Sequence, residues 1–239
     1  MVDRGLARTG GALILVGSAL AVIFNLLHPR TTSEADDAGL RLVADSDLWV
    51  LIHTGILVAL LLVFVGLLIF AIGLPESVAS WARLAIVTQG AAAAAGAIWA
   101  AIDGVAVKRV VDDWNTASGA SEEAFFAAAR GVESVSIGVF SVFILLVTGL
   151  APLMYGLAVS KSRVYPSWLG SLGIFAGSAG IIVALVQMMT EPSVVLTNII
   201  FTIVALLVTI FIGALGWYLY RGTAPGPHPA SEVRQQAAA

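Results

Sequence analysis

The sequence contains no cysteine and few charged side chains. Without cysteine, disulfides, thiol catalysis and thiolate metal sites are excluded in this chain of 239 residues. Only 11% of the residues are charged, whereas a soluble domain carries about 25%. The net charge of −3 comes with no basic stripe, so nucleic acid is not an expected partner. A water-facing surface of ordinary composition could not be built from these residues.

Long apolar runs take the place of the missing charge. Hydrophobic residues make up 59% of the chain, and its mean hydropathy is +0.97. The run 48–74, LWVLIHTGILVALLLVFVGLLIFAIGL, has no fixed charge. An uncharged run of about 18 or more residues is typical of a transmembrane helix, because a helix satisfies its own backbone hydrogen bonds in lipid.

We therefore predict an all-α fold, a polytopic membrane helical bundle with six transmembrane helices in one domain, 1–221. The expected spans are about 9–28, 48–74, 84–107, 134–159, 167–189 and 194–220. The Pro/Gly/Ala-rich tail 222–239 is expected to be disordered and cytoplasmic.

The segments between and within the spans give local predictions. A short interfacial helix is expected to end at about Ala44, and a turn is expected at 115–120, inside the longest polar connection, 108–131. Pro152 is expected to kink the fourth span. Gly173 and Gly177 have GxxxG spacing, which indicates a face for close helix packing.

The distribution of basic residues predicts that both termini are cytoplasmic. Six spans place the two termini on the same face, and that face carries the short basic turn 161–163. Its full basic set is Arg4, Arg8, Arg83, Lys161, Arg163, Arg221 and Arg234. The opposite face has fewer basic residues, and these lie among many acids. By the positive-inside rule, we expect a multi-pass protein of the cell membrane, in bacteria the inner membrane.

This topology places most polar side chains of the spans near the outer face. His53 would lie roughly 8 Å below the start of its helix, at 1.5 Å per residue. Ionisable groups at such a depth are candidate functional residues, because burying them in lipid is costly. We predict an outward-facing polar pocket with the candidates His28, His53, Asp103, Lys108, Glu133, Gln187 and Asn198.

Four of these residues are also candidate metal ligands. His28, His53, Asp103 and Glu133 offer the donor types that zinc, iron or manganese accept, although no HExxH spacing exists. A structural explanation competes, in which the same groups pair with serine, lysine or arginine and lock the bundle. A haem between the two histidines is less well supported, because His28 lies at a helix rim beside a proline.

The leading functional interpretation is binding or transport of a small or lipid-like molecule in this pocket, linked to protons through His53. The first alternative is a metal-dependent, hydrolase-like membrane enzyme that uses the same residues. A structural or regulatory subunit is the second. The lipid bilayer and a small-molecule or lipid ligand are the expected partners, and nothing in the sequence indicates an oligomeric state.

Four segments carry a resemblance to a known family: LLHPR, VADSDLWVLIHTG, AAIDGVAVKRV and YPSWLGSLGIFAG. Through them the chain resembles a bacterial family of uncharacterised six-helix integral membrane proteins. The resemblance implies the fold and the membrane location, and it implies no activity.

Overall fold

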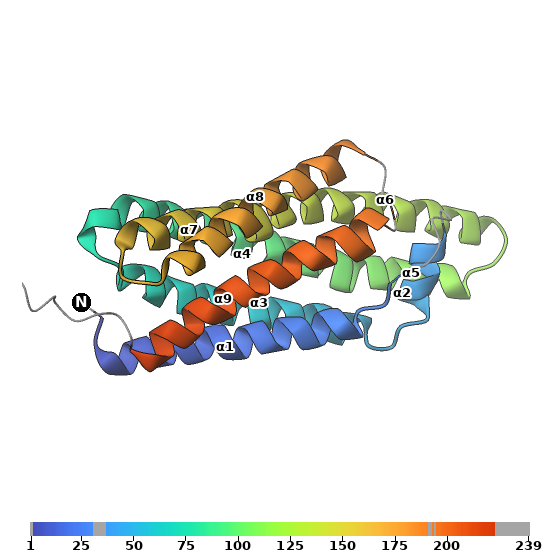
Figure 1. Cartoon of the computed structure of the whole chain (residues 1–239). Coiled ribbons are helices and arrows are strands. Elements are labelled where there is room, and N and C mark those ends of the chain that lie inside the picture. Colours follow the sequence, from blue (N-terminus) through green and yellow to red (C-terminus); the bar gives the residue numbers. More distant parts are fainter. Residues whose placement is uncertain (1, 31–36, 191–192, 194, 223–239) are drawn as a thin grey trace, which may run out of the picture.

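Helices packed side by side form one elongated bundle (Figure 1). The computed structural model describes residues 2–30, 37–190, 193 and 195–222. Over this part of the chain there is no strand, and six helices are long and apolar enough to cross a membrane. The predicted all-α bundle with six such helices is therefore confirmed. From residue 223 on, the predicted disordered tail lies outside the described residues.

Within the described residues, the π-helical turns η2 and η3 each join two α-helices, and a third, η4, leads directly into α9. In chain order the elements are α1 (Arg4–Leu27), α2 (Ala38–Ala44), α3 (Trp49–Ile72), the 3₁₀ turn η1 (Glu76–Val78), α4 (Ala79–Ala101), η2 (Ile102–Val107), α5 (Lys108–Thr116), α6 (Ala120–Ile144), η3 (Leu145–Leu150), α7 (Ala151–Ser162), α8 (Ser167–Met189), η4 (Leu196–Ile200) and α9 (Phe201–Arg221). The short helix expected to end near Ala44 is present as α2.

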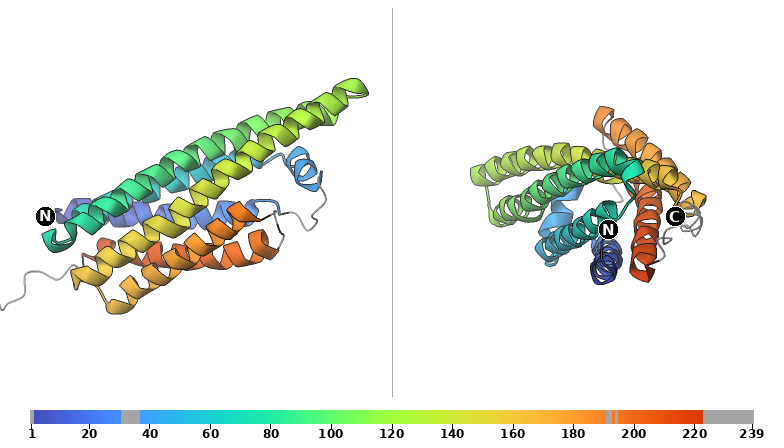
Figure 2. Two further views of the ribbon diagram at one scale, coloured as in Figure 1. Left: turned by 90° about the horizontal axis from the view of Figure 1, so that it is seen from above. Right: turned by 90° about the vertical axis from the view of Figure 1, so that its left-hand side faces the viewer.

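Two continuous helices of 41 and 43 residues form a hairpin that extends past the other helices at one end (Figure 2). Each is roughly 60 Å long at 1.5 Å per residue, about twice the thickness of a hydrocarbon core. We call this the hairpin end. The polar connection 108–131 is thus mainly helical, with a break only at 117–119, inside the predicted turn.

The hairpin holds α2 against its inner side. Val107, Val111 and Trp114 are buried in one cluster with Leu40 and Val43 of α2. Arg109, Asp112 and Asp113 between them are exposed, so α5 is amphipathic and does not need lipid around it. This packing explains why a segment that is polar in composition forms a helix.

Glycine allows close contact between α7 and α8. A Cβ on Gly177 would lie 2.4 Å from the backbone nitrogen of Leu153, and one on Gly173 would lie 2.8 Å from Cα of Gly156. Helices in lipid associate largely through such close packing. The predicted packing face is confirmed.

The irregularity predicted at Pro152 takes the form of the π-helical turn η3. Pro152 lies at the start of α7, directly after this turn. Proline has no backbone N–H and its ring crowds the preceding turn, so the regular hydrogen-bond ladder cannot continue there. A wider turn absorbs the mismatch while the helix continues.

Both ends of the described chain lie at the opposite end of the bundle (Figure 1). Gly222 adjoins Arg4, with its ideal Cβ 3.9 Å from the Arg4 side chain. We call this the terminal end. Lys161 and Arg221 lie over the rings of Trp81 and Trp217 here, at 5.6 and 4.3 Å from the ring centroids.

Candidate metal centre

His53 lies one turn into α3 at the hairpin end, and it is almost fully buried, with 1% of its surface exposed. Its Nδ1 is 2.8 Å from the backbone oxygen of Trp49. A carbonyl oxygen only accepts hydrogen bonds, so Nδ1 must carry a proton and donate it. The neutral ring therefore has an unprotonated Nε2, which is the form that binds metal ions.

The π-helical turn η2 brings a carboxylate to this nitrogen. Oδ2 of Asp103 lies 2.7 Å from Nε2 of His53. The next residue, Gly104, packs directly on the histidine, since a Cβ there would be 2.5 Å from Cβ of His53. Trp49 fixes the turn from the other side by donating from Nε1 to the backbone oxygen of Asp103 at 2.8 Å. The close approach thus needs glycine at position 104.

A serine from α6 orients the carboxylate. Ser136, which is 2% exposed, donates from Oγ to Oδ1 of Asp103 at 2.8 Å. Each carboxylate oxygen consequently faces one partner, Ser136 on one side and His53 on the other. Hydrogen bonds of this kind hold metal-binding carboxylates in position.

His28, the first residue after α1, completes the group. Its ring centroid lies 4.9 Å from that of Trp49 and 5.1 Å from that of His53. Its Nδ1 donates to the backbone oxygen of Pro29 at 2.7 Å. Both imidazoles therefore donate from Nδ1 to a backbone carbonyl, which leaves Nε2 as the nitrogen available to a ligand, the arrangement usual for metal-binding histidines.

One ligand atom from each of His28, His53 and Asp103 lies within 4.8 Å of the other two. Around zinc, with bonds of about 2.1 Å, tetrahedral ligand atoms are roughly 3.4 Å apart. Rotation of the side chains can bring the two most distant ligand atoms about 1.4 Å closer together and move the two nearest slightly apart. The three residues fit a divalent transition metal ion.

The contact between His53 and Asp103 is short, yet it is not a well-directed hydrogen bond. Although the two atoms are 2.7 Å apart, Nε2 of His53 has no hydrogen-bond partner within the described residues, because Oδ2 lies off the direction of the ring nitrogen. A lone pair facing a carboxylate oxygen at this distance is repelled unless a cation neutralises it. A second ring proton or a metal ion can do so.

A haem does not fit between the two histidines. Their rings meet edge to face with centroids 5.1 Å apart, so they are in van der Waals contact. An iron porphyrin with two axial histidines has the macrocycle between the rings. The geometry leaves no space for it.

Glu133 and Lys108 lie near the centre without joining the triad. Glu133 precedes Ser136 by one helical turn, and its Oε1 would be 3.1 Å from a Cβ on Gly39 of α2. Lys108 donates from Nζ to Oδ1 of Asp112 at 2.7 Å and to the backbone oxygen of Ala44 at 3.1 Å. Of the four candidate ligands, the structure therefore brings three together and leaves Glu133 outside the group.

The remaining candidates, Gln187 and Asn198, belong to α8 and η4. Oε1 of Gln187 is buried without a hydrogen-bond partner in the described part of the chain. The backbone oxygen of Asn198 accepts from Arg30 at 3.5 Å, and Arg30 also donates to Oγ1 of Thr202 at 3.2 Å. Asn198 thus helps to anchor the segment that carries His28.

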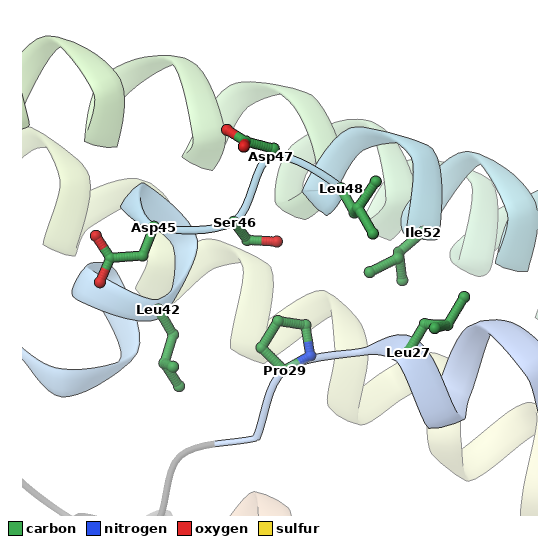
Figure 3. Close-up of a pocket in the computed structure, with 8 residues that line it drawn as sticks. All are labelled: Leu27, Pro29, Leu42, Asp45, Ser46, Asp47, Leu48 and Ile52. Atoms are coloured by element: carbon green, nitrogen blue, oxygen red, sulfur yellow. The ribbon is translucent and has the colours of Figure 1, made fainter.

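An open hollow of about 420 Å³ lies at the hairpin end, between the end of α1, the end of α2 and the start of α3 (Figure 3). It is lined by Leu27, Pro29, Leu42, Asp45, Ser46, Asp47, Leu48 and Ile52. None of the predicted pocket residues lines it, although Leu27 and Pro29 flank His28 in the chain and Ile52 precedes His53. The polar candidates are thus packed against one another, next to a hollow with mainly apolar walls.

The sequence reasoning missed Trp49, Trp99 and Ser136. The ring of His53 packs against both tryptophans, with centroid distances of 4.7 and 5.1 Å. The sequence could have predicted the contact of Trp49 with His53, because a residue four positions before His53 lies on the same helix face. The role of Ser136 could not be predicted from the sequence, since serine is frequent in packed membrane helices.

No family model, curated protein or solved structure matches the chain.

Proposed function

We propose that the protein is a multi-pass membrane metalloprotein that binds one divalent transition metal ion between His28, His53 and Asp103, zinc being the first candidate. One observation carries the proposal. Two buried or half-buried imidazoles donate from Nδ1 to backbone carbonyls, and one ligand atom of each lies within 4.8 Å of the other and of a serine-bound carboxylate. Zinc and iron take nitrogen and carboxylate ligands in such sets.

In this proposal, the metal centre lies on the extracytoplasmic side of the membrane. The basic residues Arg4, Lys161 and Arg221 lie at helix ends of the terminal end, which the positive-inside rule assigns to the cytoplasm. The termini are then cytoplasmic, the membrane is the bacterial inner membrane, and the hairpin end projects outward. A reporter fused after Arg221 that is active only outside the cell would contradict this orientation.

Metal analysis of purified protein tests the function. The protein is prepared in detergent with an affinity tag that contains no histidine, and its zinc, iron and manganese are measured per chain after dialysis. We expect a stoichiometric ion in the parent, and its loss in His28→Gln and Asp103→Asn. Asp113→Asn, an exposed acid on α5, serves as the matched control and should retain the ion.

Two results would overturn the proposal. One is a parent protein that stays metal-free after incubation with each ion, and the other is equal loading of Asp103→Asn and the parent. Size-exclusion chromatography and circular dichroism show whether each variant is folded, so that lost metal is not confused with lost structure.

A metal-dependent, hydrolase-like enzyme is the second candidate, because the triad supplies three ligands. Structural zinc sites use four protein ligands, whereas catalytic sites use three and leave a position for water or substrate. The experiment is hydrolysis of a chromogenic ester by the zinc-loaded protein in mixed micelles. Equal rates for the parent and Asp103→Asn would remove this candidate.

A further inference from the structure

We propose that the hollow at the hairpin end is the route by which the metal ion reaches the triad, and that Asp45 and Asp47 at its rim attract the ion. This inference rests on the proposed function, because it describes how that site is loaded. A buried metal site needs such a path as much as it needs ligands.

The position of the hollow is the first observation. His28 stands between Leu27 and Pro29, which both line the hollow, and its ring contacts that of His53 at a centroid distance of 5.1 Å. Ile52, another lining residue, is the neighbour of His53 in α3. Two of the three proposed ligands, His28 and His53, are thus direct chain neighbours of residues that line the hollow.

The charge of the rim is the second observation. Among the described residues, two acidic ones and no lysine, arginine or histidine line the hollow, while its walls are mainly apolar. Figure 3 shows Asp45 and Asp47 at the rim with their carboxylates turned away from the interior. Charges of one sign beside low-dielectric walls focus the electric field and raise the local concentration of the opposite ion. The carboxylates thus act on the ion before it enters, and they are not ligands.

In the part of the chain that the structure describes, none of the nearby cations forms an ion pair with the rim. Lys108 pairs with Asp112 and also donates to the backbone oxygen of Ala44, next to Asp45, and Arg41 pairs with Asp37 at 2.7 Å. Arg30 donates to Thr202 on α9.

The end of the path is the third observation. His53 has 1% of its surface exposed, and its Nε2 has no hydrogen-bond partner in the described ranges. This nitrogen lies 2.7 Å from Oδ2 of Asp103, and an ion that binds to both atoms has to arrive from outside. Ser46 supplies the one hydroxyl that points into the hollow (Figure 3), where it can hold water of the entering ion.

Stopped-flow association of Co²⁺ tests the route. Cobalt quenches tryptophan fluorescence, and the rings of Trp49 and Trp99 contact that of His53. For the double variant Asp45→Asn/Asp47→Asn we expect an association rate lower by about three- to tenfold at 10 mM salt, where the Debye length is about 30 Å. At 0.5 M salt the difference should vanish because the charges are screened.

The control double variant removes the same charge from the same end of the molecule. Asp113→Asn/Glu123→Gln changes two exposed acids of the hairpin that do not line the hollow, and it should leave the association rate within twofold of the parent.

A blocking variant separates the hollow from its charge. Ser46→Phe places a ring in the hollow and should lower the association and dissociation rates together by about tenfold or more, with the Kd unchanged, because a route affects both directions equally.

The outcomes are distinguishable. A parent that does not bind Co²⁺ refutes the proposed function. A parent that binds it, with unchanged rates in Asp45→Asn/Asp47→Asn and in Ser46→Phe, refutes only this route. A fall in rate that is equal in the control double variant assigns the effect to overall charge and also refutes the route.

Discussion

Replacing Ser136 by alanine removes one hydrogen bond from the candidate metal centre and leaves every ligand in place. The serine donates to Oδ1 of Asp103 at 2.8 Å, and both groups lie among buried residues. A hydrogen bond to a carboxylate stabilises by about 1.5–3 kcal/mol. Loss of such a supporting contact lowers metal affinity by about 10- to 100-fold, or about 1.4–2.8 kcal/mol at 1.4 kcal/mol per tenfold change.

The assay is competition for zinc between the protein and a chromogenic chelator in detergent, at fixed pH and salt. Ser141→Ala is the matched control, since Ser141 lies on the same helix, is 5% exposed, and donates only to the backbone oxygen of Ile137 at 2.9 Å. We expect the Kd for zinc to rise by about 10- to 100-fold in Ser136→Ala and to stay within about twofold of the parent in Ser141→Ala.

Equal zinc affinities of the two alanine variants would refute the reasoning. Such a result would mean that the Asp103 carboxylate needs no orientation by Ser136, and hence that it does not bind the ion. A fall in thermal stability without any change in the Kd would instead assign the hydrogen bond to packing alone.

Three further changes have defined outcomes. Gly104→Ala forces a Cβ to within 2.5 Å of His53, so it should lower the melting temperature and abolish metal binding, whereas Gly138→Ala, with no atom within 4 Å of its Cβ, should do neither. Trp49→Phe removes the donor that holds the π-helical turn and should reduce the free energy of unfolding in detergent by about 1 kcal/mol. Burial raises the pKa of Tyr165 to about 12 from an ordinary value of 10.0. Its stabilising contribution should be complete below pH 10 and lost as the pH rises through about 12, which absorbance at 295 nm and melting curves can follow in the parent and Tyr165→Phe.

The helical fold could be predicted from the sequence because lipid imposes one strong rule. An apolar run such as 48–74 can satisfy its backbone hydrogen bonds only within a helix, so run length alone identified the long helices. The polar connection 108–131 was less predictable. Its helical state depends on tertiary contacts of Val111 and Trp114 with α2, and composition does not record them.

The candidate site could be predicted in part. Topology placed His53, Asp103 and His28 near the same end of the bundle, with His28 at the rim, and the structure brings them together. Depth does not specify rotation about a helix axis, which is why Glu133 was included and Ser136 was not. Those two residues are three positions apart on α6, and only the packing against η2 decides which of them touches the carboxylate.

The π-helical turn η2 joins two parts of one long helix in a fixed rotational phase. Before it, Trp99 packs on His53; after it, Val111 and Trp114 share a buried cluster with Trp49 and α2. A π-turn holds one residue more than an α-turn, and each residue advances a helix by about 100°. Deleting Ile102 would therefore leave an unbroken α-helix in which one of these two contacts is turned away from α3. The number of residues in this turn, and not any single side chain, lets the same helix complete the polar centre and hold α2 beyond it.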